Sequence, residues 1–387
     1  MPNEPSDFER LTGPDRRRVP RPHGLAGLVA LIAVGVVVGL VALYPPSTPD
    51  IDLSDFGFAD DVVPATVTAV EIAECPDFPG VDCSIVEFSD AEGVVVHTQS
   101  FPDDGSAQPQ LEVGDEVFLS VVDAGDGTNL YNYADRDRTL LLGAVALLFA
   151  AAVVGLGRMR GLAALLGLGI SLLVLLGFIV PAIIAGEDAV LVAAVGGSAI
   201  ILVALYLAHG YTPLTHVAAV GAFAALALTT ALSWGVLELA QFTGLAGEES
   251  YYLLLIPGFD ISGLLLAGIV LGAIGALDDV TVTQASAVWE VRQANPALES
   301  GDLFASGLRV GRDHIASTVN TLLLAYAGAA MPLLILLSLS RQPFASIASS
   351  EVVAVEIVRT LVGSIGLVAS VPITTWLASR QAIGSLA

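Results

Sequence analysis

The chain has 387 residues, of which 55% are hydrophobic, and its mean hydropathy is +0.77. Such values exclude an ordinary soluble domain and favour a membrane protein. The formal net charge is −24, and all basic side chains other than histidine are arginines, so a basic surface for nucleic acid is excluded.

Eight apolar segments have about the 20 residues that a helix needs to cross a lipid bilayer. They are Leu25–Tyr44, Thr139–Gly157, Leu162–Ala185, Ala189–Ala208, Leu214–Phe242, Ile261–Leu277 and beyond, Ile315–Leu339, and Ile357–Ala378. We therefore predict an all-α polytopic membrane bundle of about eight transmembrane helices. In the sixth segment, Gly268 and Gly272 form a small-residue pattern that lets a neighbouring backbone approach closely.

Arginines predict the orientation of these helices. Five of them (Arg10, Arg16, Arg17, Arg18 and Arg21) precede the first segment, which places the N-terminus in the cytosol. With eight spans the C-terminus is cytosolic as well. The first segment is long for a cleaved signal peptide and no small-x-small site follows it, so we interpret it as an uncleaved anchor. The predicted parts are a basic tail (1–24), the first transmembrane helix (25–44), an extracytoplasmic acidic domain (45–138), a seven-helix transmembrane domain (139–380) and a cytosolic C-terminus (381–387).

The extracytoplasmic domain has the pattern of a small β-domain. After a linker at Pro45–Asp61 come valine-rich alternating segments separated by turn residues: Ala65–Ile72, Cys83–Phe88, Gly93–Thr98 and Glu116–Val122. Their spacing predicts an inserted OB-like β-barrel or sandwich of about five strands. About half of the acidic residues lie in this domain. They form either a solvated surface, which we favour, or an antenna that concentrates cations.

The two cysteines of the chain, Cys75 and Cys83, lie in this exported domain. Two thiols outside the cytosol predict one disulfide that closes a short loop. A metal site with His97 as third ligand is the alternative, but the spacing is a poor zinc signature.

The strongest functional signal follows the 17 uncharged residues Ile261–Leu277. At about 100° per residue, Asp279, Thr283, Ser286 and Glu290 form one narrow polar stripe, while Asp278 lies about 100° away from it. A carboxylate at hydrocarbon depth is costly and usually faces a bundle interior or a wet cavity. We therefore predict that the stripe lines a polar cavity.

A second polar run begins the seventh segment at Gly311. It carries Arg312, Asp313, His314, Asn320 and Thr321. A short connection that begins at Asn295-Pro296 predicts an amphipathic helix and makes the sixth and seventh segments antiparallel neighbours. Their polar faces are then expected to meet.

Three interpretations of these two polar runs stay open. The carboxylate, hydroxyl and amide oxygens of these runs suit a small cation, and the sequence does not identify the metal. Asp279 with His314 instead suits proton transfer. Alternatively, both runs lie at the water interface, with Arg292 or Arg312 paired to the aspartates. The chain shows neither a hydrolase constellation nor a phosphate-binding loop, so we predict no enzyme activity and no cofactor.

The motifs GAIGALDDVTVTQASAVWE (272–290) and GRDHIASTVNTLLLAYAGAAMPLLIL (311–336) resemble those of the YibE/F family of bacterial multipass membrane proteins. The resemblance covers about 139–380 and implies a location in the bacterial plasma membrane. Asp279 matches the aspartate of the first motif, and Gly311, Arg312, Asp313, Asn320 and Thr321 match the second. Asp278 occupies a position that is often apolar in the family.

The sequence as a whole predicts a permease, transporter or channel for a small solute, cation or proton. The alternative is a membrane scaffold or envelope-assembly factor that binds a partner through the exported domain. We expect Asp279→Asn to abolish activity and Asp278→Asn to be milder. No feature of the sequence predicts the oligomeric state.

Overall fold

The computed structural model describes residues 23–47, 61–75, 80–103, 109–123, 128–245, 247–254, 256, 258–340 and 342–384. The chain forms two compact units, one of Asp50–Gly155 and one of Met1–Pro49 with Leu156–Ala387. Most of the basic tail and most of the predicted linker lie outside the described residues.

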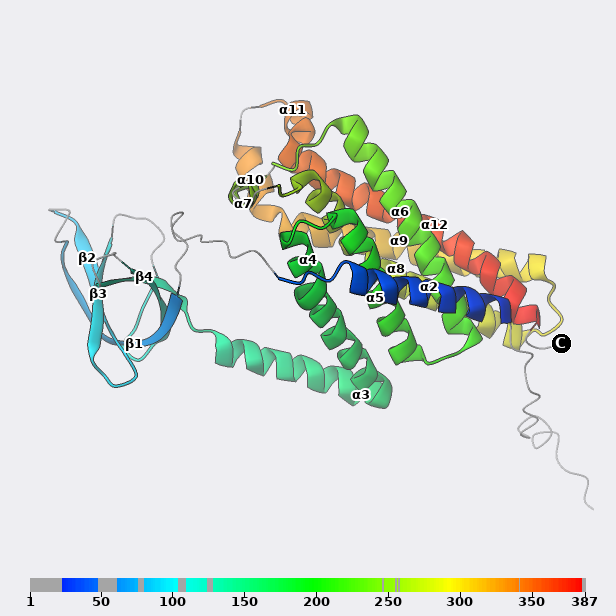
Figure 1. Ribbon diagram of the computed structural model, residues 1–387, viewed down its shortest axis with the longest axis horizontal. Helices are drawn as coiled ribbons and strands as arrows, with labels where there is room; N and C mark the ends of the chain where they lie inside the picture. Colours follow the sequence, from blue (N-terminus) through cyan, green and yellow to red (C-terminus); the bar gives the residue numbers. More distant parts are fainter. Residues whose placement is uncertain are drawn as a thin grey trace, which may run out of the picture. The chain divides into compact units, whose positions relative to one another are not determined.

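Five strands form one antiparallel sheet in the smaller unit (Figure 1). They are β1 (Asp61–Glu74), β2 (Asp82–Ser89), β3 (Val95–Pro102), β4 (Glu116–Asp123) and β5 (Asn129–Arg136), in the spatial order β3-β2-β1-β4-β5. The four predicted segments correspond to β1–β4. The pattern did not reveal β5 because its asparagines and aspartate are depleted in strands.

The sheet curls around a small apolar core. Val67, Phe88 and Leu119 are fully buried in it. At the edges, the backbone N–H of Tyr133 on β5 donates a hydrogen bond to Oε1 of Gln99 on β3, at 2.8 Å. In the described part of the sheet, the edge strands β3 and β5 are joined by side-chain contacts of this kind. They do not pair through backbone hydrogen bonds.

The predicted disulfide is confirmed. Cys75 and Cys83 are bonded, with their Cα atoms 4.9 Å apart, and both side chains are buried. Because Ala73 pairs with Cys83 in the sheet, the bond joins the end of β1 to the start of β2. A metal site on these two sulfurs is thereby excluded.

The larger unit is helical. Its elements, with the start of α3 contributed by the smaller unit, are α2 (His23–Ala42), α3 (Thr139–Val174), the π-helical turn η2 (Leu175–Ile179), α4 (Val180–Ile184), α5 (Ala189–His209), α6 (Pro213–Ala240), α7 (Glu248–Leu253), α8 (Ile261–Ala294), α9 (Ser300–Ala329), α10 (Met331–Leu339), α11 (Phe344–Ser349) and α12 (Glu351–Gly384).

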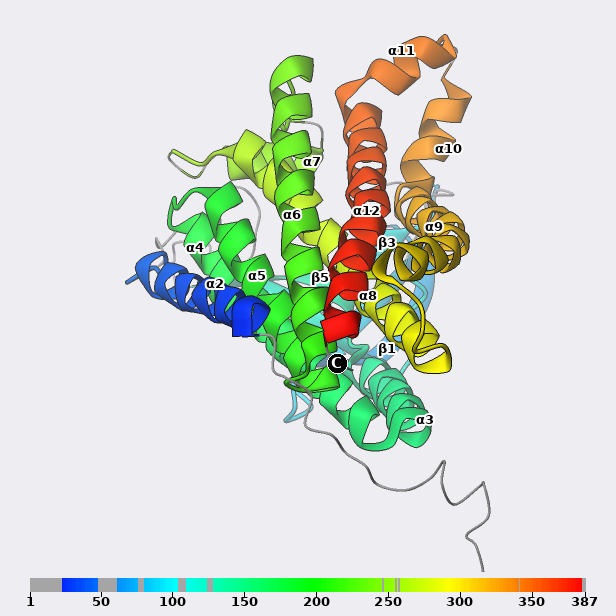
Figure 2. The same cartoon turned by 90° about the vertical axis from the view of Figure 1, so that its right-hand side faces the viewer.

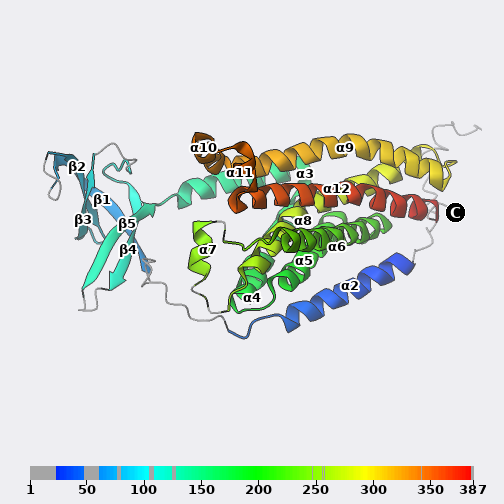
Figure 3. The same ribbon diagram turned by 90° about the horizontal axis from the view of Figure 1, so that it is seen from above.

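Helices α6, α8 and α12 pack against one another at the centre of this unit (Figure 2). Helix α5 packs on α8, and α9 packs on both α8 and α12 (Figure 3). The approach of α6 and α12 depends on glycine. A Cβ atom at Gly221 would collide with Thr374 Oγ1, and one at Gly366 would collide with Thr229 Oγ1. The helices are in contact there because these side chains are absent.

Six helices of the described chain are long and apolar enough to cross a membrane, and the bent pair of α9 and α10 would make a seventh. The eight predicted segments lie in these helices, apart from one or two residues at the end of three of them. The counts differ because Thr139–Ile184 is counted once here, although Arg158, with φ 51° and ψ −128°, breaks it into two helices. The sequence prediction treated the two sides of Arg158 as separate spans.

The connection between α8 and α9 differs from the prediction. Instead of a separate amphipathic helix, a short turn follows Ala294, and α9 begins at Ser300 and continues without a break to Ala329. The Asn295 side chain accepts a hydrogen bond from the Ala297 N–H within this turn, at 3.2 Å. Helices α8 and α9 are neighbours as expected.

Candidate functional site

Helix α8 buries the side opposite the predicted polar stripe. Leu277, Thr281, Gln284 and Val288 are buried and recur at helical spacing. On the stripe itself, Asp279, Thr283 and Glu290 are exposed and Ser286 is half-buried. The centres of the two faces lie about 160° apart around the helix axis. In this structure the predicted stripe is therefore the exposed side of α8, and Asp279 lies on it.

The buried polar group of α8 is Gln284, which the sequence analysis did not single out. Its Nε2 donates hydrogen bonds to the Gly307 carbonyl of α9 at 2.8 Å and to Thr375 Oγ1 of α12 at 2.7 Å. The side chain is 3% exposed. Gln284 thus ties three helices together, which is a structural role with all its amide hydrogens accounted for.

Asp278 occupies an environment different from that of its neighbour. It is half-buried and lines a cavity of about 520 Å³ between α3, α5 and α8. Its Oδ1 atom is inaccessible to solvent and has no hydrogen-bond partner. Neither aspartate forms an ion pair with an arginine of the described chain. Arg292, one of the expected partners, instead donates to the Leu298 carbonyl at 2.7 Å.

Apolar side chains form most of the wall of this inner cavity. The lining residues are Ala164, Gly167, Leu168, Ser171, Leu172, Leu175, Ile200, Ile201, Ala204, Ala208, His209, Leu271, Ile274, Gly275 and Asp278. Ser171 donates its hydroxyl hydrogen to the Gly167 carbonyl at 2.9 Å, which leaves its oxygen lone pairs available. Asp278 and His209 are the ionisable groups of the lining. Ser171 and His209 come from helices distant in sequence, so no local pattern could have linked them to Asp278.

The predicted residues of α9 do not join this cavity. Arg312, Asp313, Asn320 and Thr321 are exposed. His314 is half-buried, with its Nε2 buried and without a hydrogen-bond partner. The two polar runs lie on neighbouring helices, α8 and α9, but their side chains face different surroundings. The structure therefore does not unite the ten predicted residues in one site.

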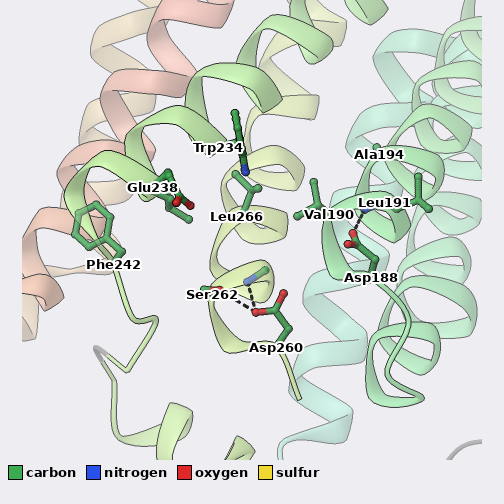
Figure 4. A pocket seen from close by; sticks show the side chains of 12 residues that line it. Asp188, Val190, Leu191, Ala194, Trp234, Glu238, Phe242, Asp260, Ser262 and Leu266 are labelled. Atoms are coloured by element: carbon green, nitrogen blue, oxygen red, sulfur yellow. Dashed lines mark hydrogen bonds between the residues drawn. The ribbon is translucent and has the colours of Figure 1, made fainter. Parts of the chain in front are cut away.

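A second cavity, of about 570 Å³, lies between the start of α5, the end of α6 and the start of α8 (Figure 4). Three carboxylates border it: Asp188, Glu238 and Asp260. Asp188 caps α5 by accepting from the Leu191 N–H at 2.8 Å, and Asp260 caps α8 by accepting from the Gly263 N–H at 2.9 Å. Two of the three carboxylates thus have a structural use.

No group of three or more histidine, cysteine, aspartate or glutamate side chains in the described residues has an arrangement that could hold a metal ion. Asp278 offers a single carboxylate. The site therefore suits a proton, or a cation whose other ligands are mostly water molecules or groups of a solute.

The fold and the cavity define a class of protein: a bundle of membrane-length apolar helices with a small β-domain and an ionisable group inside the bundle. The YibE/F-like protein family matches residues 145–383, and the chain belongs to that family. No curated protein and no solved structure matches this chain.

Proposed function

We propose that this protein is an integral membrane permease or channel that moves a small cation or proton, or a solute coupled to one, and that Asp278 is its cation-binding residue. The observation that carries the proposal is the buried Asp278 oxygen without a partner. A carboxylate left in this condition costs several kcal/mol, and structural carboxylates ordinarily have a donor or an arginine beside them. A bound cation or proton would offset the cost.

The depth of Asp278 along α8 supports the proposal. The residue follows Ile261, the first residue of α8, by 17 positions. At 1.5 Å per residue this is about 26 Å, close to the thickness of the hydrocarbon core of a bilayer. We propose that the helices cross the bacterial plasma membrane eight times, with separate spans before and after the break at Arg158, both termini in the cytosol and residues 45–138 outside. The inner cavity would then open near the cytosolic edge of the hydrocarbon.

The carboxylate-bordered cavity at the start of α8 fits the same function. Under the proposed topology it lies at the extracytoplasmic ends of α5, α6 and α8. Carboxylates at such a mouth raise the local concentration of cations. Between the two cavities, Gly197 of α5 packs closely on Ile274 of α8. Passage from one cavity to the other would require these helices to move.

The test is cation flux into proteoliposomes that contain the full chain, followed with a pH-sensitive dye and with radioactive sodium. We expect flux above that of empty vesicles. Asp278→Asn keeps the side-chain shape and removes the charge, and it should lower flux at least about tenfold, the equivalent of one charge-assisted interaction.

Asp279→Asn is the matched control, because Asp279 is exposed on the next position of the same helix. It should retain most of the flux. Equal effects of the two substitutions at equal protein yield would reject Asp278 as the binding residue. Absence of flux in the wild-type protein would reject transport and favour the alternative of a membrane scaffold.

A further inference from the structure

The inner cavity between α3, α5 and α8 combines one carboxylate with an aliphatic wall. Its polar side chains are those of Asp278, Ser171 and His209, and the other described residues of the lining are glycine or aliphatic. Its volume of about 520 Å³ is that of a pocket for an organic molecule and far exceeds what an inorganic ion needs. The cavity therefore suits a positively charged solute that also carries apolar surface.

Packing between α3 and α5 sets the level of Ser171 in the bundle. A Cβ atom at Gly167 of α3 would lie 3.7 Å from the Cα atom of Ala204 on α5. Helix α3 continues through η2 into α4, and the chain reverses in the short connection before α5, so α3 and α5 run in opposite directions. Ser171 lies one turn beyond Gly167 and therefore near the level of Ile200, which also lines the cavity.

Packing between α5 and α8 sets the level of Asp278. Gly197 of α5 packs closely on Ile274 of α8. The two helices run in the same direction, because the starts of both border the carboxylate-bordered cavity. Asp278 lies one turn beyond Ile274 and therefore near the level of Ile201. Ser171 and Asp278 thus reach the inner cavity at about the same level, from opposite helices.

The two ends of the cavity differ in character. Leu175 and Leu271 line it toward the start of α5, and about 10 Å of α8 separate Leu271 from Asp278. His209, which is exposed, lines it toward the end of α5. The cavity thus runs from an exposed end, past Ser171 and Asp278, to an aliphatic end with room for a hydrocarbon chain.

The Asp278 carboxylate is free to pair with a cation in this cavity. Its Oδ1 atom is inaccessible, but the residue as a whole is only half-buried and belongs to the lining. The χ2 torsion of aspartate is soft, so a small rotation exchanges the surroundings of the two oxygens. No arginine of the described chain forms an ion pair with this carboxylate.

We infer that the inner cavity binds a primary alkylammonium, with its charged group between Asp278 and Ser171 and its chain against the aliphatic end. The inference rests on the proposed function and names the class of cation. An ammonium has three N–H donors, of which one suits the carboxylate and one the free lone pairs of the Ser171 hydroxyl. The leucine side chains then cover the chain.

Two related ligands fit this cavity less well. A quaternary ammonium has no N–H group, and proteins usually recognise it with a cage of Trp, Tyr or Phe rings, which the described lining lacks. A phospholipid headgroup with an ammonium would bring its phosphate, a second negative charge, close to Asp278. A free alkylamine has neither disadvantage.

The experiment is equilibrium binding of radioactive hexylamine to the full-length protein in detergent at about pH 7.5, where the amine is charged. Protein-free micelles give the correction for partitioning. We expect saturable binding, with three competitors at least about tenfold weaker. Hexanol lacks the charge, hexyltrimethylammonium lacks the N–H donors, and methylamine lacks the chain.

Two substitutions test the two parts of the site. Asp278→Asn should weaken hexylamine binding at least about tenfold. Gly275→Leu should weaken it by filling the cavity, because Gly275 lines the cavity and a Cβ atom there meets nothing within 4 Å. The matched controls are Asp279→Asn and Gly169→Leu, at exposed positions outside the lining. A Cβ atom at Gly169 likewise meets nothing within 4 Å. Both controls should bind like the wild type.

Thermal unfolding should show that all variants fold, and the competitor series uses the wild type alone. Absence of saturable hexylamine binding, equally strong binding of hexanol, or binding that survives Asp278→Asn would overturn the inference. Displacement by hexyltrimethylammonium at the same concentration as hexylamine would overturn the role of the N–H donors. Hexylamine binding in a protein without flux would overturn transport alone, whereas flux of protons or sodium without hexylamine binding would overturn only this inference.

Discussion

At the scale of single residues, neighbouring aspartates have opposite environments. One step along α8 turns the side chain by about 100°, which takes Asp278 into an apolar cavity and leaves Asp279 exposed. The polar stripe in the sequence pointed to Asp279, whereas the cavity in the structure is lined by Asp278. A polar stripe in a sequence identifies one face of a helix. It does not show which face of that helix the neighbouring helices cover.

His97 of the β-domain gives a prediction at the same scale. Burial lowers the pKa of His97 below 6.5, partly opposed by a hydrogen bond with Gln99. The unfolded chain therefore binds a proton more readily than the folded domain. The domain should be fully stable above about pH 6.5 and lose stability as the pH falls below it.

The measurement is hydrogen exchange of β3 in the full chain, corrected for the intrinsic effect of pH. His97→Phe keeps a ring against Phe88, which stacks on His97 at 6.2 Å, and removes the titrating group. Protection in the wild type should decline between about pH 7 and about pH 5, and the variant should show a smaller decline. Identical pH profiles would contradict the assignment to His97.

At the scale of elements, the helices of the central bundle are held by small residues and by a few buried polar links. Alanines of α6 such as Ala218, Ala219 and Ala222 are fully buried, and Gln284 connects α8 to α9 and α12. Close contact between backbones compensates for the weak hydrophobic drive between helices in lipid. The helix ends are polar and exposed, which is why sequence polarity there says little about a binding site.

Two glycines of α12 allow this packing to be tested. A Cβ atom at Gly366 would collide with Thr229 of α6, whereas one at Gly363 meets only the end of Leu322 at an ordinary 3.6 Å. Gly366→Ala should destabilise the protein by about 1–3 kcal/mol. Gly363→Ala should be neutral or stabilise by up to about 1 kcal/mol, because alanine is the better helix former.

The measurement is thermal unfolding of the two variants in the same detergent. The opposite signs are the informative result, since both substitutions add one methyl group to the same helix. Equal destabilisation would show that α6 and α12 do not depend on the glycine at 366 for their contact.

At the scale of the whole molecule, the composition separates the two units. The β-domain has its own buried core and a disulfide, whereas the helical unit has membrane-length apolar helices. A disulfide requires an oxidising compartment, which agrees with export of residues 45–138. We propose that the connection between α8 and α9 lies on the cytosolic side.

Single added cysteines test this topology, because the disulfide leaves no free cysteine in the native chain. Glu92→Cys lies in the exposed turn between β2 and β3, and Glu299→Cys lies in the exposed turn before α9. An impermeant thiol reagent added to intact cells should label position 92 and leave position 299 unlabelled. Labelling of position 299 from outside, with lysed cells as the control for reactivity, would contradict the proposed orientation.

The sequence by itself determined the family, the apolar helices, four strands of the β-domain and the disulfide. Each depends on local information: composition, the lengths of apolar runs, the alternation within strands, and two cysteines in one exported segment. The match to the YibE/F-like family over residues 145–383 confirms the family suggested by two short motifs.

Only the tertiary structure decided which polar side chains are enclosed. Asp278 shares a cavity with Ser171 and His209 because α3, α5 and α8 surround one space. Arg359 and Tyr326 meet because the glycines of α8 leave room between α9 and α12. Such groupings depend on how helices rotate about their axes and on contacts between distant segments, which a residue's neighbours in sequence do not encode.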